Sequence, residues 1–150
     1  MILNDVLTRQ NVFTKIILKD GEKELSKELK VKIMRIRMAY TKIKKAFDTE
    51  VQEFTEELVP QELKDLSAKQ DRNDAENARM QELTNKVNSE YQEFLIQKGN
   101  EEVTPIDDAL TMDEYSDILD INAGNNIEIN GNKISAADFL EIIYDLFVKE

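Results

Sequence analysis

Apolar side chains recur at helical spacing through the second quarter of the chain. The series runs from Leu25 to Leu58 and spans 33 positions in nine steps, or 3.67 residues per step. Its members are Leu25, Leu29, Ile33, Ile36, Tyr40, Ile43, Phe47, Val51, Phe54 and Leu58. This period is that of a straight α-helix and lies nearer to an eleven-residue repeat than to the heptad of a left-handed supercoil. The pattern predicts one helix about 50 Å long, which needs a packing partner along its length.

Three further apolar residues, Val31, Met34 and Met38, lie on the opposite side of this predicted helix. The first half of the helix is therefore apolar on two faces. We expect the second face to be covered by the amino-terminal helix or by the carboxy-terminal segment. Methionine side chains adapt readily to protein partners, so Met34, Met38 and Met80 could line a binding groove, although core packing is the role that we favour for them. The candidate interaction residues on this helix are Val31, Met34 and Met38.

A second long helix is predicted over 74–98, where apolar residues return at helical spacing until Gly99-Asn100 supplies a C-cap. Pro60 suits the start of a short helix between the two long ones, and 67–78 contains no large apolar residue. We therefore expect an antiparallel helical hairpin whose polar tip lies between residues 60 and 74.

The amino-terminal segment mixes apolar and polar residues at spacings closer to helical than to alternating. The pattern predicts a short helix over 9–18, which Asp20-Gly21 ends because glycine adopts the positive φ of a turn or C-cap.

The last third of the chain has different local signals. Thr111 and Glu114 form a capping-box pattern and predict a helix that ends at about Asp120. Asn130-Gly131, with isoleucines alternating before it, predicts a β-hairpin with a type I′ turn. Ser135 then caps a closing helix.

The elements together predict a mainly α fold. Its main feature is a long antiparallel helical hairpin, coiled-coil-like, joined to a small C-terminal α+β unit that contains a β-hairpin. We divide the chain into residues 1–100, with the short helix and the long hairpin, and residues 101–150, an acidic unit packed on the hairpin.

Composition removes several kinds of chemistry. The chain has 150 residues and a net charge of −11, with no His and no Cys. An imidazole base, a thiolate nucleophile, a Cys/His zinc site and a disulfide are therefore excluded. The longest apolar run is a few residues, so we expect neither a membrane span nor an export leader.

Charge changes sign along the chain. Residues 1–45 carry 12 basic and 5 acidic side chains, whereas residues 101–150 carry 2 basic and 13 acidic ones. The two ends can neutralise each other within one chain, which we favour, or pair head to tail between copies. The basic residues from Lys23 to Lys45 point in nearly every direction around a helix, which disfavours nucleic-acid binding.

The acidic segment raises the question of a metal site or a catalytic pair. Its carboxylates are Asp107, Asp108, Asp113, Glu114, Asp117 and Asp120. They are not accompanied by a glycine-rich phosphate loop, and no frame around 120–138 gives calcium-loop ligands in order. We predict no catalytic residue, no cofactor and no metal. Asp113, Glu114, Asp117 and Asp120 are instead candidate contacts to a protein partner.

The order of the elements resembles that of a family of small acidic phage-encoded proteins of unassigned function. The resemblance rests on Leu7-Thr-Arg-Gln-Asn and on the stretch from Glu24 to Arg37, Glu-Leu-Ser-Lys-Glu-Leu-Lys-Val-Lys-Ile-Met-Arg-Ile-Arg. It implies a viral origin and a role in the virion or its assembly, and it supplies no catalytic residue.

Two functional hypotheses follow. The first is a non-enzymatic structural or adaptor protein of a tailed phage, at the tail, portal vertex or capsid, whose partners are other phage proteins or further copies of itself. The second is a small acidic regulatory protein that inhibits a host protein through residues 101–120 by imitating a polyanion. The first places the protein in the virion and the second in the host cytoplasm.

Overall fold

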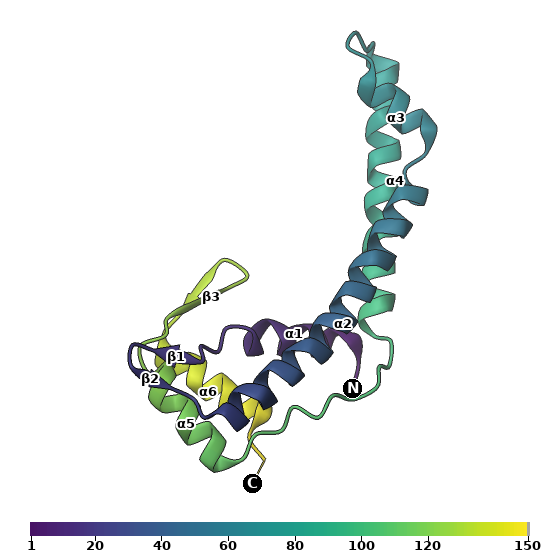
Figure 1. Ribbon diagram of the computed structural model, residues 1–150. Helices are drawn as coiled ribbons and strands as arrows, with labels where there is room; N and C mark the ends of the chain where they lie inside the picture. The colour runs from purple at the N-terminus through teal and green to yellow at the C-terminus, as the bar shows by residue number, and fades with distance from the viewer. Residues whose placement is uncertain (150) are drawn as a thin grey trace.

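Two long helices, α2 and α4, run antiparallel and form a stalk that projects from a helical base (Figure 1). The computed structural model describes residues 1–149. The helices in this range are α1 Leu3–Phe13, α2 Lys27–Leu58, α3 Gln61–Ala68, α4 Asp74–Gly99, α5 Met112–Asn122 and α6 Ala136–Phe147. Two short antiparallel hairpins pair β1 Lys19–Asp20 with β2 Lys23–Glu24, and β3 Ile127–Ile129 with β4 Asn132–Ile134. The predicted mainly α fold, with its long hairpin and a small β-hairpin near the carboxyl end, is confirmed.

Helix α2 has the extent that its apolar series predicts. Ser26 is the N-cap, and its hydroxyl accepts a hydrogen bond of 3.2 Å from the Leu29 N–H. The helix ends where Val59 becomes extended before Pro60, because the proline ring disfavours the α conformation in the preceding residue. Leu29, Ile33, Ile36 and Tyr40 are the buried residues of its first half.

The upper stalk is held by few apolar contacts. Phe54 of α2 and Phe94 of α4 stack with ring centroids 4.0 Å apart, and Leu63 of α3 and Leu83 of α4 are buried.

Gly99 ends α4 beside the Asn4 side chain, where a Cβ would lie only 2.4 Å from Asn4 Oδ1. The C-cap is Asn100 in a right-handed conformation, so Gly99 permits this close approach and does not provide a positive φ.

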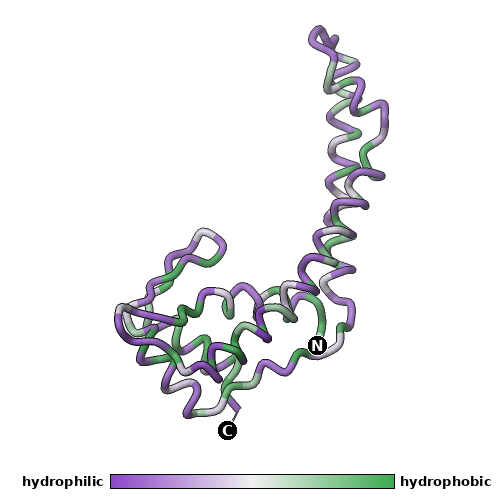
Figure 2. The backbone as a smooth tube through the Cα atoms, in the orientation of Figure 1, coloured by the Kyte–Doolittle hydropathy of each residue, from purple (hydrophilic) through white to green (hydrophobic). Residues whose placement is uncertain are grey.

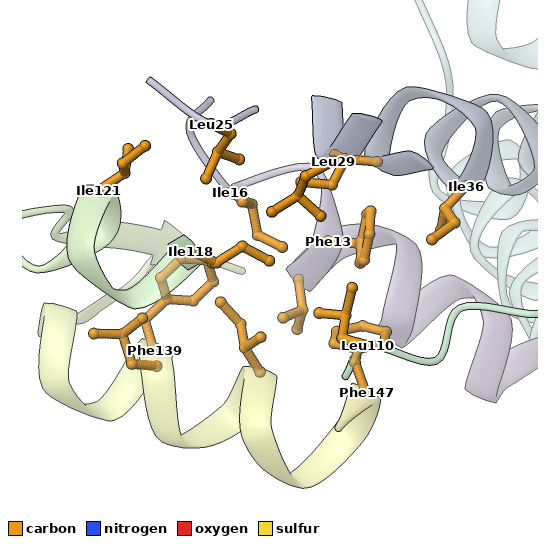
Figure 3. Packing of buried hydrophobic residues seen from close by; sticks show 14 of the residues in the cluster. Phe13, Ile16, Leu25, Leu29, Ile36, Leu110, Ile118, Ile121, Phe139 and Phe147 are labelled. Carbon is orange, nitrogen blue, oxygen red and sulfur yellow. The ribbon is translucent and has the colours of Figure 1, made fainter. Parts of the chain in front are cut away.

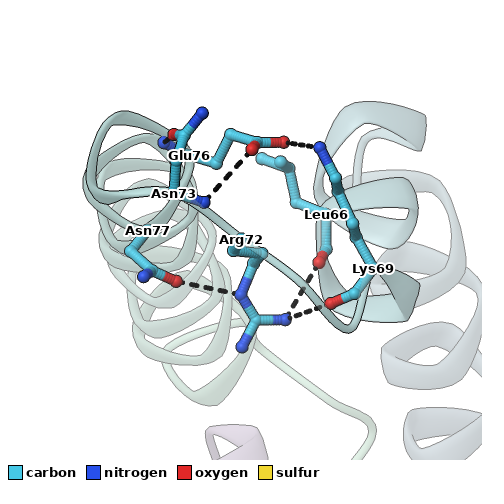
Figure 4. A network of polar contacts seen from close by, with 6 residues as sticks. All are labelled: Leu66, Lys69, Arg72, Asn73, Glu76 and Asn77. Atoms are coloured by element: carbon cyan, nitrogen blue, oxygen red, sulfur yellow. Dashed lines mark hydrogen bonds and ion pairs between the residues drawn. The ribbon is translucent and has the colours of Figure 1, made fainter.

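The tip of the stalk is a polar turn over residues 69–73, within the range that the sequence predicts (Figures 2 and 4). Arg72 donates hydrogen bonds to the Leu66 and Lys69 carbonyls, at 3.1 and 2.9 Å, and its Nε donates to Asn77. Asn73 caps α4 in a capping box with Glu76. These bonds satisfy the free backbone groups at the end of α3 and the start of α4.

The hydrophobic core lies in the base and joins α1, the first half of α2, α5 and α6 (Figure 3). Phe13 is at its centre, with its ring 5.0 Å from that of Phe147 and 6.0 Å from that of Tyr40. The other fully buried apolar residues of the cluster are Val6, Ile16, Ile33, Leu110, Ile118, Phe139 and Ile143. The cluster thus draws on both residues 1–100 and residues 101–150.

The amino-terminal helix differs from the prediction. It covers Leu3–Phe13 and not 9–18, and the chain leaves it at Thr14. Ile17 then binds the buried Asn122 through both backbone groups, with its N–H 3.0 Å from Oδ1 and its carbonyl 3.2 Å from Nδ2. This contact replaces the hydrogen bonds of a continued helix. Gly21, with φ +63°, supplies the predicted turn between β1 and β2.

The elements of the last third agree with their local signals. Thr111 and Glu114 form the capping box of α5, and Ser135 caps α6. The turn between β3 and β4 has φ +52° at Asn130 and +80° at Gly131, as a type I′ turn requires.

Candidate functional site

The side of α2 that faces away from the core is exposed and partly apolar. Val31, Met34 and Met38 are 48, 45 and 70% exposed. The prediction that another segment covers this face is therefore wrong for the described residues 1–149. The physical reason is that α1, α5 and α6 all join the core through the opposite side of α2, where Leu29, Ile33 and Ile36 are buried. We call the exposed side, from Lys27 to Lys45, the outer face of α2.

The outer face contains a shallow groove of about 440 Å³. Its lining residues are Met34, Arg37, Met38, Thr41, Lys42 and Lys45. Arg37 forms its inner wall, since its guanidinium donates to the Ile16 carbonyl and one of its nitrogens lies 3.9 Å from the Met34 sulfur. Burial lowers the pKa of Arg37. The groove thus has an anchored arginine on one side and freely exposed methionine and lysine side chains on the other.

The basic residues of this region divide into two groups. Lys23, Lys30, Lys32 and Lys44 form ion pairs with Asp120, Glu24, Glu114 and Asp48, and Arg37 binds the Ile16 carbonyl. Within the described residues, Lys27, Arg35, Lys42 and Lys45 form no ion pair.

These four unpaired cations lie around the apolar residues of the outer face. Lys27 and Arg35 stand four residues on either side of Val31, and Lys42 stands four residues after Met38. Residues four apart are neighbours on a helix surface, so these three cations border the apolar patch, and Lys45 lines the same groove as Met34 and Met38. The sequence alone does not reveal this arrangement. Taken together, the basic residues point in nearly every direction around the helix, and the four on the outer face stand out only when the ion-paired ones are set aside.

Three of the four acidic residues singled out by the sequence, Asp113, Asp117 and Asp120, share one side of α5, and Glu114 lies beside them. Asp113, Glu114 and Asp117 border a cleft of about 490 Å³ between α5 and the start of α2, with Lys32 and Arg35 on its other side. Asp120 borders the adjoining groove beside β2, and Asp117 lines both hollows.

Two of these acids are engaged and two are free. Glu114 lies 2.7 Å from Lys32 Nζ, and Asp120 lies 3.4 Å from Lys23 Nζ. Burial would raise the pKa of Glu114, but the hydrogen bonds from Lys32 and from the Thr111 N–H outweigh it, so the pKa is below its ordinary value. Asp113 and Asp117 are exposed and form no ion pair within residues 1–149.

Part of the charge of the two ends is balanced within one chain, which is the arrangement that we favour from the sequence. Besides the pairs of Lys23 and Lys32, the amino terminus lies 3.3 Å from Glu102 and Arg9 lies 2.8 Å from Asp108. The carboxylates 101–120 are thus partly neutralised by residues 1–32 of the same chain.

Two apolar residues of α5 are also exposed, and sequence reasoning missed them. Met112 and Leu119 are 49 and 41% exposed. With Ser116 and Ala123 they follow the spacing i, i+4, i+7 and i+11, so they share one side of α5. This spacing was a readable signal. The side they occupy adjoins that of Asp113 and Asp120, which gives α5 an exposed face that is apolar on one edge and acidic on the other.

Other kinds of site find no support in residues 1–149. No group of three or more metal-ligating side chains occurs in this range. None of its helices is long and apolar enough to cross a membrane. No family model, curated protein or solved structure matches the chain.

Proposed function

We propose that this protein is a non-enzymatic structural or adaptor protein of a tailed phage, associated with the virion at the tail, portal vertex or capsid. The observation that carries the proposal is the outer face of α2, where Val31, Met34 and Met38 are exposed among four cations that have no ion partner within residues 1–149. The phage assignment rests on the resemblance of the element order and of 24–37 to small acidic phage proteins.

The composition of the outer face favours a protein partner. Methionine and arginine are enriched in protein interfaces, and a contiguous exposed apolar patch with a polar rim is typical of an interaction site. Covering such side chains gains about 25 cal/mol for each Å² of apolar surface removed from water.

The shape of the molecule supports an architectural role. The stalk of α2, α3 and α4 extends well beyond the core cluster of the base (Figure 1). Its tip is closed by a polar hydrogen-bond network around Arg72 and has no buried apolar residue between 67 and 78. A long arm with a polar end is suited to spanning the distance between neighbouring subunits.

The alternative, an acidic regulator of a host protein, is favoured by the two unpaired carboxylates Asp113 and Asp117. It is weakened by Glu114 and Asp120, which bind Lys32 and Lys23 and would have to release them to imitate a polyanion. We therefore prefer the structural role.

The test is the protein content of purified virions, measured by quantitative mass spectrometry, with complementation of a deletion mutant. We expect several copies per virion. A gene with Met34→Glu and Met38→Glu should fail to restore infectious particles, whereas Ile96→Glu, at an exposed apolar residue of α4, should restore them.

Absence of the protein from virions, together with full complementation by the double variant, would overturn the proposal. Stoichiometric capture of one host protein that is lost in Asp113→Asn/Asp117→Asn would establish the regulator in its place.

A further inference from the structure

We infer that the outer face of α2 binds the exposed face of α5 of a second copy of this chain. The inference rests on the proposed function and names the partner of its interaction surface. It joins two features of one molecule: an apolar patch among unpaired cations, and an apolar edge beside unpaired carboxylates.

The two faces are complementary in charge. Around Val31, Met34 and Met38, the cations that form no ion pair in the described part of the chain are Lys27, Arg35, Lys42 and Lys45. Beside Met112 and Leu119 the unpaired groups are the carboxylates Asp113 and Asp117, and Asp120 holds only an exposed pair with Lys23. Opposite potentials steer association and fix the register of an interface, and the apolar centres gain from mutual burial.

The two faces also match in length. The part of the outer face from Val31 to Lys45, which holds its three apolar residues, extends over about 21 Å of helix, and the α5 face from Met112 to Ala123 extends over about 17 Å. Three turns of α5 can therefore lie along four turns of α2. A single helix-on-helix contact of this size is at the low end for stable complexes, so the association should be weak in solution and strengthened where many copies are held together.

Pairing of like faces is disfavoured. Two outer faces would bring eight unpaired cations together, and two α5 faces would bring their carboxylates together, which costs free energy in each case. The contact therefore joins unlike surfaces, and each copy has one of each. A two-fold pair makes the contact twice, whereas a head-to-tail arrangement continues into a ring or a filament.

The experiment measures the mass in solution by sedimentation over a range of protein concentrations, at about 50 and about 500 mM salt, since screening weakens exposed charge pairs. The wild type should associate at low salt, with a dissociation constant at least tenfold higher at high salt. Lys42→Glu/Lys45→Glu should be monomeric, and so should Asp113→Lys/Asp117→Lys. Mixed in equal amounts, the two variants should associate again, because the unaltered outer face of one meets the unaltered α5 face of the other, and the two reversed faces are also opposite in charge.

A matched control carries the same charge change elsewhere. Lys64→Glu/Lys86→Glu alters two exposed stalk lysines that form no ion pair in the described residues, and it should associate like the wild type. Circular dichroism establishes that each variant is folded. If the α5 variant unfolds, Leu119→Glu, at an exposed side chain, takes its place and should also abolish association.

A wild type that is monomeric at every concentration, or a variant mixture that does not associate, would overturn the inference. So would salt-sensitive binding of duplex DNA that the Lys42→Glu/Lys45→Glu variant loses, since the outer face would then serve a nucleic acid. If the wild type is monomeric but present in virions, and Met34→Glu/Met38→Glu still fails to complement, the outer face binds another phage protein. The proposed function would then stand without this inference.

Discussion

Arg9 and Asp108, 99 positions apart in the chain, form an ion pair of 2.8 Å inside the base. Asp108 is only 5% exposed and also accepts a hydrogen bond from the Tyr40 hydroxyl. Burial and the neighbouring Asp108 carboxylate both raise the pKa of Tyr40, which keeps the phenol a neutral donor. One carboxylate thus ties α1 and α2 to the connection that follows α4.

Asp108→Asn should strongly destabilise the fold. The substitution keeps the shape of the side chain but removes the charge that compensates Arg9, whose side chain is 19% exposed. Removing one partner of a buried pair costs about 3 kcal/mol. Urea unfolding followed by circular dichroism measures the loss, with Asp107→Asn, at the exposed neighbouring residue, as the control that should change little. A loss below about 1 kcal/mol would show that the pair contributes little more than a surface one.

Glu114 should make stability depend on pH. Its pKa is lower in the folded protein than in the unfolded chain, where it is about 4.3. As pH falls, the unfolded chain binds the proton first, so the contribution is complete above this value and is lost as pH falls through the folded-state pKa. Glu114→Gln should cost about 0.5–1 kcal/mol at pH 7 and less at pH 3.

The measurement for Glu114 is urea unfolding at both pH values. Glu128→Gln, on the exposed side of β3, is the matched control and should show no difference between them. A cost for Glu114→Gln that is equal at pH 7 and pH 3 would mean that its Lys32 pair does not contribute to stability.

Asn122 should be among the most sensitive positions of the base. It is fully buried, and its amide binds the Ile17 N–H, the Ile17 carbonyl and the Ile118 carbonyl. Asn122→Ala leaves the Ile17 N–H and carbonyl without this partner and should cost about 2–4 kcal/mol in unfolding experiments. Asn132→Ala, on the exposed strand β4, should cost far less. Similar losses in the two variants would contradict a special role for the buried amide.

Elements with strong local signals could be predicted from the sequence. Two of these signals, the Thr111 capping box and the Asn130-Gly131 turn, involve only a few neighbouring residues. The third, the apolar series from Leu25 to Leu58, repeats over many residues. Their structures therefore depend little on the rest of the chain. The extent of α2, the range of the hairpin tip and the β-hairpin followed from them.

Features that depend on distant residues could not be predicted. The first helix ends early because Ile17 meets Asn122, 105 positions later. Periodicity indicates that Val31, Met34 and Met38 share a face, but which face of α2 the base covers depends on how all the elements pack. The cations of the outer face could not be picked out from the sequence, because that choice depends on which basic residues form ion pairs, namely Lys23, Lys30, Lys32 and Lys44.

Phe54→Ala should loosen the stalk without affecting the base. The stacked pair with Phe94, whose planes are inclined by 6°, is a main apolar contact between α2 and α4 there, and neither ring belongs to the core cluster. Segments with few buried contacts open independently of the core. Losing about 1.4 kcal/mol of stacking and burial raises local opening tenfold.

Hydrogen exchange followed by mass spectrometry separates the two regions. Amides of α2 after Phe47 and amides of α4 should exchange about tenfold faster in the Phe54→Ala variant, while those of α1 and α6 should keep the wild-type rate. Ile96→Ala removes a side chain that is 62% exposed on the same helix as Phe94 and should leave both regions unchanged. Equal acceleration of base and stalk amides would mean that they unfold as one cooperative unit, and the stalk would then owe its order to the base core through the continuous helix α2.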